Sequence, residues 1–140
     1  MENERIIKIT DLQTTEEGED RLEITTRGTL KGDEDNYTLE FDEIFEDGLK
    51  SHTVLTVRDG KSVNLLRRGD MNNEIILEAG KRHNFQYGTP YGEMQMGVFA
   101  NTVESKMTPE GGTLKLVYTI DFYGNFTSAK DMLIEVGNTF

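Results

Sequence analysis

The chain has 140 residues, with 26 acidic and 15 basic side chains and no cysteine. The net charge of −11 repels phosphate backbones and anionic headgroups, which argues against a nucleic acid or membrane partner. No apolar run approaches the ~18 residues needed to cross a bilayer, no signal peptide is visible, and disulfides and thiolate metal sites are excluded. We therefore expect one domain over residues 1–140. The absence of cysteine fits a reducing cytosol, and it also fits many secreted proteins.

Apolar and polar residues alternate with period two along most of the chain. Successive side chains of a strand point to opposite faces, so this alternation predicts strands with one buried face. In chain order, the apolar sides are Leu22-Ile24-Thr26, Tyr37-Leu39-Phe41, His83-Phe85-Tyr87, Met94-Met96-Val98-Ala100, Leu114-Leu116-Tyr118-Ile120-Phe122 and Met132-Ile134-Val136. Turn residues separate these runs at 18–20, 32–36, 47–48, 59–60, 108–112 and 123–125. The pattern predicts about ten strands, joined as a meander of hairpins.

Gly28 lies on the apolar face of its strand, between Thr26 and Leu30. A glycine at such a position allows a sharp bend or a close approach of two backbones. An all-β chain of hairpins must hide its sheet edges, either by closing into a barrel or by stacking two sheets. Gly28 favours the first solution, an antiparallel meander closed into a strongly bent barrel of about 8–10 strands.

One hairpin can be assigned a register. Residues 58–60 fit a three-residue loop with Gly60 in the left-handed conformation, so that Leu55 pairs with Val63 and Thr53 pairs with Leu65. A one-residue slip would invert every side chain, and this loop keeps the apolar residues of both strands on one face.

The same alternation places Arg67 on the apolar face, near the end of its strand. A guanidinium there costs desolvation energy unless an acceptor meets it. The acceptor is either an internal carboxylate or backbone carbonyl, or the carboxylate or phosphate of a ligand, which arginine binds through two parallel hydrogen bonds.

The stretch from Gly88 to Gly92 is interpreted as a connection, because Pro90 fixes its own φ and the flanking glycines permit a reversal. Residues 93–98 are predicted to form a strand with Met94 and Met96 pointing into the barrel. Methionine and aromatic side chains inside an eight-stranded barrel either fill it or line a cavity for one small ligand.

Several short motifs resemble a known family. In order, they are Arg67-Arg68-Gly69, Glu78-Ala79-Gly80-Lys81-Arg82, Thr89-Pro90-Tyr91-Gly92 followed by Met94 and Met96, and Gly112-Thr113-Leu114 leading to Tyr118. Together they resemble the YwiB-like family of small bacterial proteins over nearly the whole chain. The resemblance implies a calycin-type β-barrel, related to lipocalins and fatty-acid-binding proteins, in a bacterial cytoplasm. It implies no activity, because none is established for the family.

Catalytic and metal-binding signatures are missing from the sequence. There is no nucleophile elbow, phosphate-binding loop, dinucleotide fingerprint or zinc-protease motif. The acidic run 33–36 fails the calcium-loop pattern, because Thr38 stands where that loop needs glycine. His83 shares its face with Phe85 and Tyr87, and we interpret it as a partly buried structural residue. We therefore expect no catalytic residue, metal or cofactor.

We expect a non-enzymatic binding barrel that takes a small apolar or amphipathic ligand, with Arg67 near the polar end of that ligand. The candidate ligand-binding residues are Arg67, Phe85, Tyr87, Tyr91, Met94, Met96, Tyr118 and Met132. The alternative is a protein–protein interaction module, since residues 1–50 carry 16 acidic and six basic side chains suited to a basic partner. A homodimer is a further option. An enzyme acting in the barrel mouth ranks last, because no nucleophile or base stands out.

Overall fold

The computed structural model describes residues 4–44, 48–70, 72–89 and 92–138. These residues form ten β-strands: β1 (Glu4–Thr15), β2 (Gly18–Gly32), β3 (Tyr37–Ile44), β4 (Lys50–Arg58), β5 (Ser62–Gly69), β6 (Asn72–Glu78), β7 (Arg82–Thr89), β8 (Gly92–Thr108), β9 (Gly111–Phe122) and β10 (Asn125–Gly137). Within the described ranges, the protein has no helix long and apolar enough to cross a membrane.

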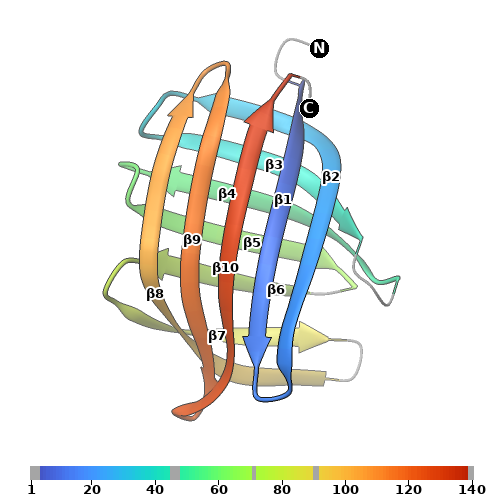
Figure 1. Cartoon of the computed structure of the whole chain (residues 1–140), viewed down its shortest axis with the longest axis vertical. Helices are drawn as coiled ribbons and strands as arrows, with labels where there is room; N and C mark the ends of the chain where they lie inside the picture. The colour runs from blue at the N-terminus through green and yellow to red at the C-terminus, as the bar shows by residue number, and fades with distance from the viewer. Residues whose placement is uncertain (1–3, 45–47, 71, 90–91, 139–140) are drawn as a thin grey trace.

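The strands form a closed antiparallel barrel in which each strand pairs with the next one in the chain. β10 returns to β1, with pairs from Ile6–Gly137 to Thr14–Ala129, and this pairing closes the sheet. In Figure 1, β1, β2 and β8–β10 form a front layer, and β3–β7 cross behind them. The predicted all-β meander and its closure into a barrel are confirmed. The first turn falls slightly earlier than expected, at residues 16–17, so that Gly18 already begins β2.

β2 curves from the front layer toward the back layer (Figure 1), and it passes from β1 to β3 as its partner around Gly28. Gly28 pairs with Arg5 of β1 on one side and with Phe41 of β3 on the other. A Cβ at this position would lie 2.2 Å from the carbonyl oxygen of Glu40 and 2.7 Å from Cδ1 of Ile7. Only a residue without a side chain allows this approach, so Gly28 makes the close backbone approach that is one of the two roles considered for it.

The predicted register of the β4–β5 hairpin is wrong by two residues. The loop comprises residues 59–61 rather than 58–60, so the pairs are Leu55–Leu65 and Thr53–Arg67. Contacts with the β2–β3 turn accompany this loop: Gly60 N donates to Asp35 O at 2.8 Å, and Asp59 N donates to Asn36 Oδ1 at 3.1 Å. The alternation within one hairpin cannot predict these contacts, because they join residues of two different turns. Because the error is an even number, every side chain keeps its predicted face.

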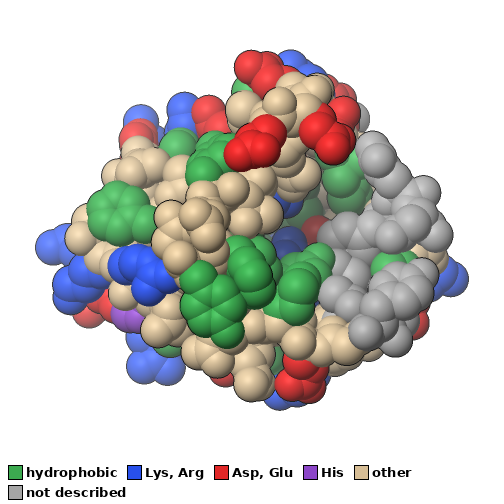
Figure 2. Space-filling model, turned by 90° about the horizontal axis from the view of Figure 1, so that it is seen from below, with side chains coloured by type: hydrophobic (Ala, Val, Ile, Leu, Met, Phe, Trp, Pro, Cys, Tyr) green, Lys and Arg blue, Asp and Glu red, His purple; other side chains and the backbone are tan. Residues whose placement is uncertain are grey.

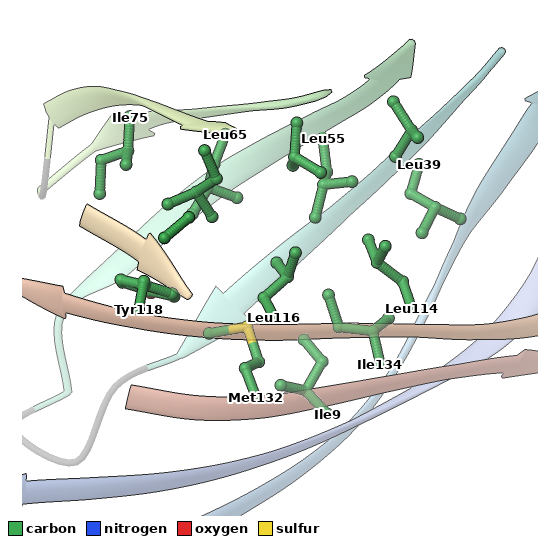
Figure 3. Close-up of a cluster of buried hydrophobic side chains, with 14 of the residues drawn as sticks. Ile9, Leu39, Leu55, Leu65, Ile75, Leu114, Leu116, Tyr118, Met132 and Ile134 are labelled. Carbon is green, nitrogen blue, oxygen red and sulfur yellow. The ribbon is translucent and has the colours of Figure 1, made fainter. Parts of the chain in front are cut away.

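Buried hydrophobic side chains pack together inside the barrel (Figure 3), and their burial falls toward one end of it. The inward side chains of β9 follow this gradient: Leu114 and Leu116 are fully buried, Tyr118 is 1% exposed, and Phe122 is 40% exposed. The closed end is filled by fully buried aliphatic residues: Ile7, Leu39, Leu55, Val57, Val63, Leu77, Leu114, Leu116 and Ile134. The interior is therefore a dry core over part of its length only.

Candidate functional site

A cavity of about 400 Å³ occupies the open end of the barrel. Its apolar walls come from Ile9, Leu22, Ile24, Ile75, Met94, Met96, Ile120 and Met132. Its polar lining comes from Asp11, Gln13, Glu43, Arg67, Tyr87, Tyr118, Thr127, Ser128 and Lys130. The volume lies at the small end of the ~300–1,000 Å³ range of small-molecule pockets.

The mouth of the cavity carries exposed hydrophobic residues. Figure 2 looks onto this end of the molecule and shows a hollow with basic and acidic side chains inside it and hydrophobic side chains along part of its edge. Near this edge, the β9–β10 hairpin exposes Phe122, Tyr123 and Phe126, and the rings of Phe122 and Tyr123 lie edge to face at 4.6 Å. The alternation along β9 predicts that Phe122 lies on the buried face, but the strand continues past the packed interior and Phe122 is exposed.

Arg67 meets an internal carboxylate. Its Nε donates to Oε1 of Glu43 at 3.1 Å, and the two side chains are 12% and 6% exposed. Oγ1 of Thr53, the ladder partner of Arg67, donates to the same carboxylate oxygen at 2.5 Å. Burial lowers the pKa of Arg67, but the charge of Glu43, the neighbouring Tyr118 and the hydrogen bond from Arg67 to Glu43 together outweigh burial and raise it. The first of the two acceptors considered for Arg67, an internal carboxylate, is therefore present.

A second ion pair lies in the same cavity. Nζ of Lys130 donates to Oδ2 of Asp11 at 2.9 Å, and the side chains are 19% and 11% exposed. Burial lowers the pKa of Lys130, whereas its neighbours Tyr118 and Asp11 raise it, and the net shift is upward. Oδ1 of Asp11 is buried and has no hydrogen-bond partner among the described residues.

The two ion pairs share one neighbourhood around Tyr118. Burial raises the pKa of the Tyr118 phenol, and the charges of Lys130, Arg67, Asp11 and Glu43 all act on it. Tyr118 is also the direct ladder partner of Lys130. The side chains of Asp11, Glu43, Arg67 and Lys130 thus form a belt with no net charge. On β1 and β10 this belt lies between the packed interior and the mouth of the cavity.

Asn73 adds a third polar group beside the belt. It pairs with Arg67 on one side and with Tyr87 on the other, and both of these line the cavity. Its side chain is buried, and neither amide atom has a hydrogen-bond partner within the described ranges. A buried amide without partners is uncommon in folded proteins.

The structure brings most of the predicted ligand-binding residues together. The residues that line the cavity are Arg67, Tyr87, Met94, Met96, Tyr118 and Met132. Met94 lies at the mouth and is 47% exposed, whereas Phe85 is buried in the core and lies outside the cavity lining. Tyr91 falls outside the described residues.

Sequence reasoning missed three of the four charged residues in the belt, namely Asp11, Glu43 and Lys130. Each lies two positions from an inward apolar residue, since Asp11 follows Ile9, Glu43 follows Phe41, and Lys130 precedes Met132. The period-two signal that identified Arg67 therefore also marks them.

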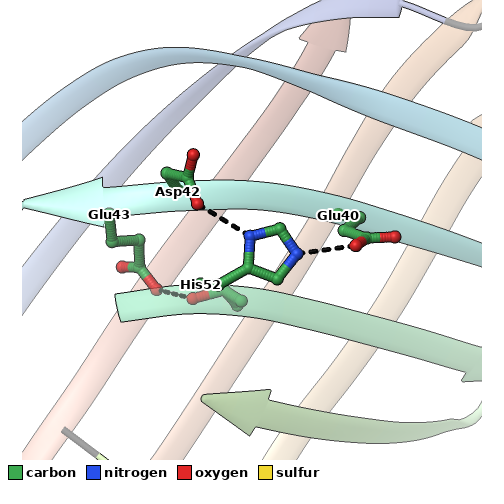
Figure 4. A network of polar contacts seen from close by, with 5 residues as sticks. Glu40, Asp42, Glu43 and His52 are labelled. Atoms are coloured by element: carbon green, nitrogen blue, oxygen red, sulfur yellow. Dashed lines mark hydrogen bonds and ion pairs between the residues drawn. The ribbon is translucent and has the colours of Figure 1, made fainter. Parts of the chain in front are cut away.

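A separate polar cluster lies on the outer face of β3 and β4 (Figure 4). His52 is hydrogen-bonded through Nδ1 to Asp42 Oδ1 at 2.7 Å and through Nε2 to Glu40 Oε2 at 2.6 Å. The hydrogen bonds to Asp42 and Glu40 raise the pKa of His52 above its ordinary value of 6.5. Glu43 lies on β3 beside Asp42, but its side chain points to the inner face and lines the cavity. The His52 cluster is therefore separate from the cavity.

We expect His52 to titrate above pH 6.5 in the folded protein. A raised pKa contributes stability that is complete below pH 6.5 and is lost as the pH rises through the folded-state pKa. NMR titration of the two histidines measures the pKa, and the His52→Gln variant assigns their signals. In that variant, the fall in stability with rising pH is expected to flatten. A His52 midpoint at or below 6.5 would contradict the carboxylate arrangement.

Two of the acidic runs of the first third lie apart from each other. The run 16–20 covers the β1–β2 turn and the start of β2, and the run 33–35 lies in the β2–β3 turn. These turns are at opposite ends of the 15-residue strand β2. Oδ1 of Asp33 accepts from the backbone N–H groups of Asp35 and Asn36, which identifies the second run as a turn.

Comparisons with known proteins agree with this architecture. The crystal structure of the ywiB protein from Bacillus subtilis superposes with a TM-score of 0.85 at 17% sequence identity, covering 99% of this chain and 93% of that chain. At this identity the likeness shows the fold alone, which is the calycin-like barrel implied by the resemblance. No curated protein matches the chain. The model of a domain of unknown function, DUF1934, matches residues 7–134. The protein therefore belongs to the DUF1934 family of YwiB-like barrels.

Proposed function

We propose that the protein is a non-enzymatic binding protein that takes a small apolar or amphipathic molecule into the open end of its barrel. One observation carries this proposal: the interior holds an unfilled cavity of about 400 Å³, although the rest of the barrel is filled by fully buried aliphatic side chains. Protein interiors are close-packed, so a void of this size beside a well-packed core needs a reason.

The lining of the cavity suits an amphipathic guest. Ile9 and Met132 form apolar floor positions, and Asp11 and Lys130 lie two residues nearer the mouth on the same strands. Methionine side chains adapt to guests of different shape. The exposed aromatic residues of the β9–β10 hairpin offer an apolar path into the hollow.

The alternative functions have less support. An acidic docking surface would need the acidic runs of the first third together, whereas the runs 16–20 and 33–35 lie toward opposite ends of β2. An enzyme in the barrel mouth would need an activated nucleophile or base. The four charged groups of the cavity are held in two ion pairs instead.

Titration with an uncharged fluorescent probe, N-phenyl-1-naphthylamine, tests the proposal. We expect saturable one-to-one binding to the wild-type protein. Ile75→Trp should weaken binding at least tenfold because Ile75 lines the cavity, and Ile76→Trp on the outer face should change it less than twofold. Circular dichroism checks that both variants fold. The absence of saturable binding, together with a ligand-free mass by native mass spectrometry, would contradict the proposal.

A further inference from the structure

We infer that the guest carries an uncharged head group that both donates and accepts hydrogen bonds, such as a hydroxyl or a primary amide. This inference rests on the proposed binding function. It concerns the head group alone, which meets the belt formed by Asp11, Glu43, Arg67 and Lys130.

The charge balance of the belt excludes a charged head. Arg67 is neutralised by Glu43, and Lys130 is neutralised by Asp11, so the cavity offers no net charge to a guest. A carboxylate would place a third negative charge beside two cations that already have partners. An ammonium group would add a third positive charge. Burial of an uncompensated charge carries a desolvation penalty comparable with the whole binding energy of a small guest.

The hydrogen-bonding groups of the belt favour a head that both donates and accepts. Nζ of Lys130 has three N–H groups, and its one hydrogen bond within the described ranges is to Asp11. That nitrogen therefore has protons for an acceptor on the guest. Asp11 lines the cavity, and its Oδ1 is buried without a partner within the described ranges, so the same cavity also lacks a donor. A carboxylate only accepts and an ammonium only donates, whereas a hydroxyl or an amide does both.

A series of compounds that share a straight chain of ten carbons and differ in the head group tests this inference. Displacement of N-phenyl-1-naphthylamine is measured at pH 7.5 with 1-decanol, decanamide, decanoate and decylammonium. We expect decanol and decanamide to bind at least tenfold more tightly than either charged compound. Equal or tighter binding of decanoate or decylammonium would overturn the inference and leave the proposed function intact. Failure of the probe itself to bind would instead overturn the proposed function, and the inference with it.

Removing one anion of the belt should reverse this preference. Glu43→Gln leaves Arg67 without its carboxylate, and Asp11→Asn does the same to Lys130, so each variant gives the cavity one positive charge. In each folded variant we expect the affinity for decanoate to rise at least tenfold relative to decanol. Glu104→Gln is the control, because Glu104 is exposed and pairs with Lys106 outside the cavity. An unchanged decanoate-to-decanol ratio in both anion variants would overturn the charge argument. If neither variant folds, the wild-type series decides alone.

Discussion

Arg67→Met is expected to destabilise the barrel by about 3–5 kcal/mol, the usual cost of removing one partner of a buried ion pair. The substitution keeps most of the aliphatic bulk but leaves the Glu43 carboxylate in a site where only 6% of its side chain is exposed. Thr53 still donates one hydrogen bond to that carboxylate, but a hydroxyl cannot neutralise its charge.

A second substitution distinguishes a stranded charge from a packing defect. In the double variant Arg67→Met, Glu43→Gln, the uncompensated charge is gone while the altered packing remains. We expect the double variant to recover at least half of the lost stability, so the two sites should show a large coupling energy. Urea denaturation of the wild-type, single and double variants measures this coupling.

The surface pair Arg21–Glu23 provides the matched control. Its side chains are 65% and 51% exposed, and exposed pairs of this kind contribute about 0–1 kcal/mol. Arg21→Met should therefore change stability by less than about 1 kcal/mol. A similar, small loss for Arg67→Met would mean that Glu43 is solvated by the cavity and does not depend on Arg67.

The sequence predicted the antiparallel meander because both of its determinants are local. Alternation with period two marks the strands, and the residues between the runs mark the hairpins that join neighbours. Gly28 favoured a strongly bent barrel over a sandwich. In the structure it lies so close to the carbonyl oxygen of Glu40 that a Cβ atom would not fit. The β4–β5 register was missed because contacts with the β2–β3 turn hold its loop.

The site could be predicted only in part. Arg67 was identified because one strand's alternation is enough to place it on the inner face. Its partner was not, since the predicted register would place Arg67 opposite Ser51 instead of Thr53, and Glu43 lies two strands away. The pair formed by Asp11 and Lys130 joins residues 119 positions apart and depends on the pairing of β1 with β10. No local pattern encodes that closure.

Whether the interior is filled or hollow also lies beyond the sequence pattern. Met132 and Leu116 have the same period-two signal and face each other across β9 and β10. Leu116 is fully buried in the packed part, whereas Met132 lines the cavity. The two residues are ladder partners at the same level of the barrel, so which of them reaches the cavity depends on the stagger and curvature of all ten strands.

Truncation of Leu116 and of Met132 is expected to have large and unequal effects on stability. Leu116→Ala should destabilise the protein by about 3–5 kcal/mol, because it opens a new void among close-packed side chains. Met132→Ala should cost about 2 kcal/mol, the low end for such truncations, because it only enlarges a space that already exists. Urea denaturation measures both losses, and unchanged m-values would show that the variants unfold from comparable states. Leu12→Ala, at a 36% exposed leucine, is the control and should cost less than about 1 kcal/mol.

The order of the two losses matters more than their size. If Met132→Ala costs as much as Leu116→Ala, then Met132 is packed like the closed end and the cavity is filled in solution. If the costs differ as expected, a bound guest should raise the cost of Met132→Ala. The guest stabilises the wild type through its contact with Met132, and it stabilises the Met132→Ala variant less. The gap between Leu116→Ala and Met132→Ala should therefore narrow when saturating guest is added, and this change links the stability of the barrel to the occupancy of its open end.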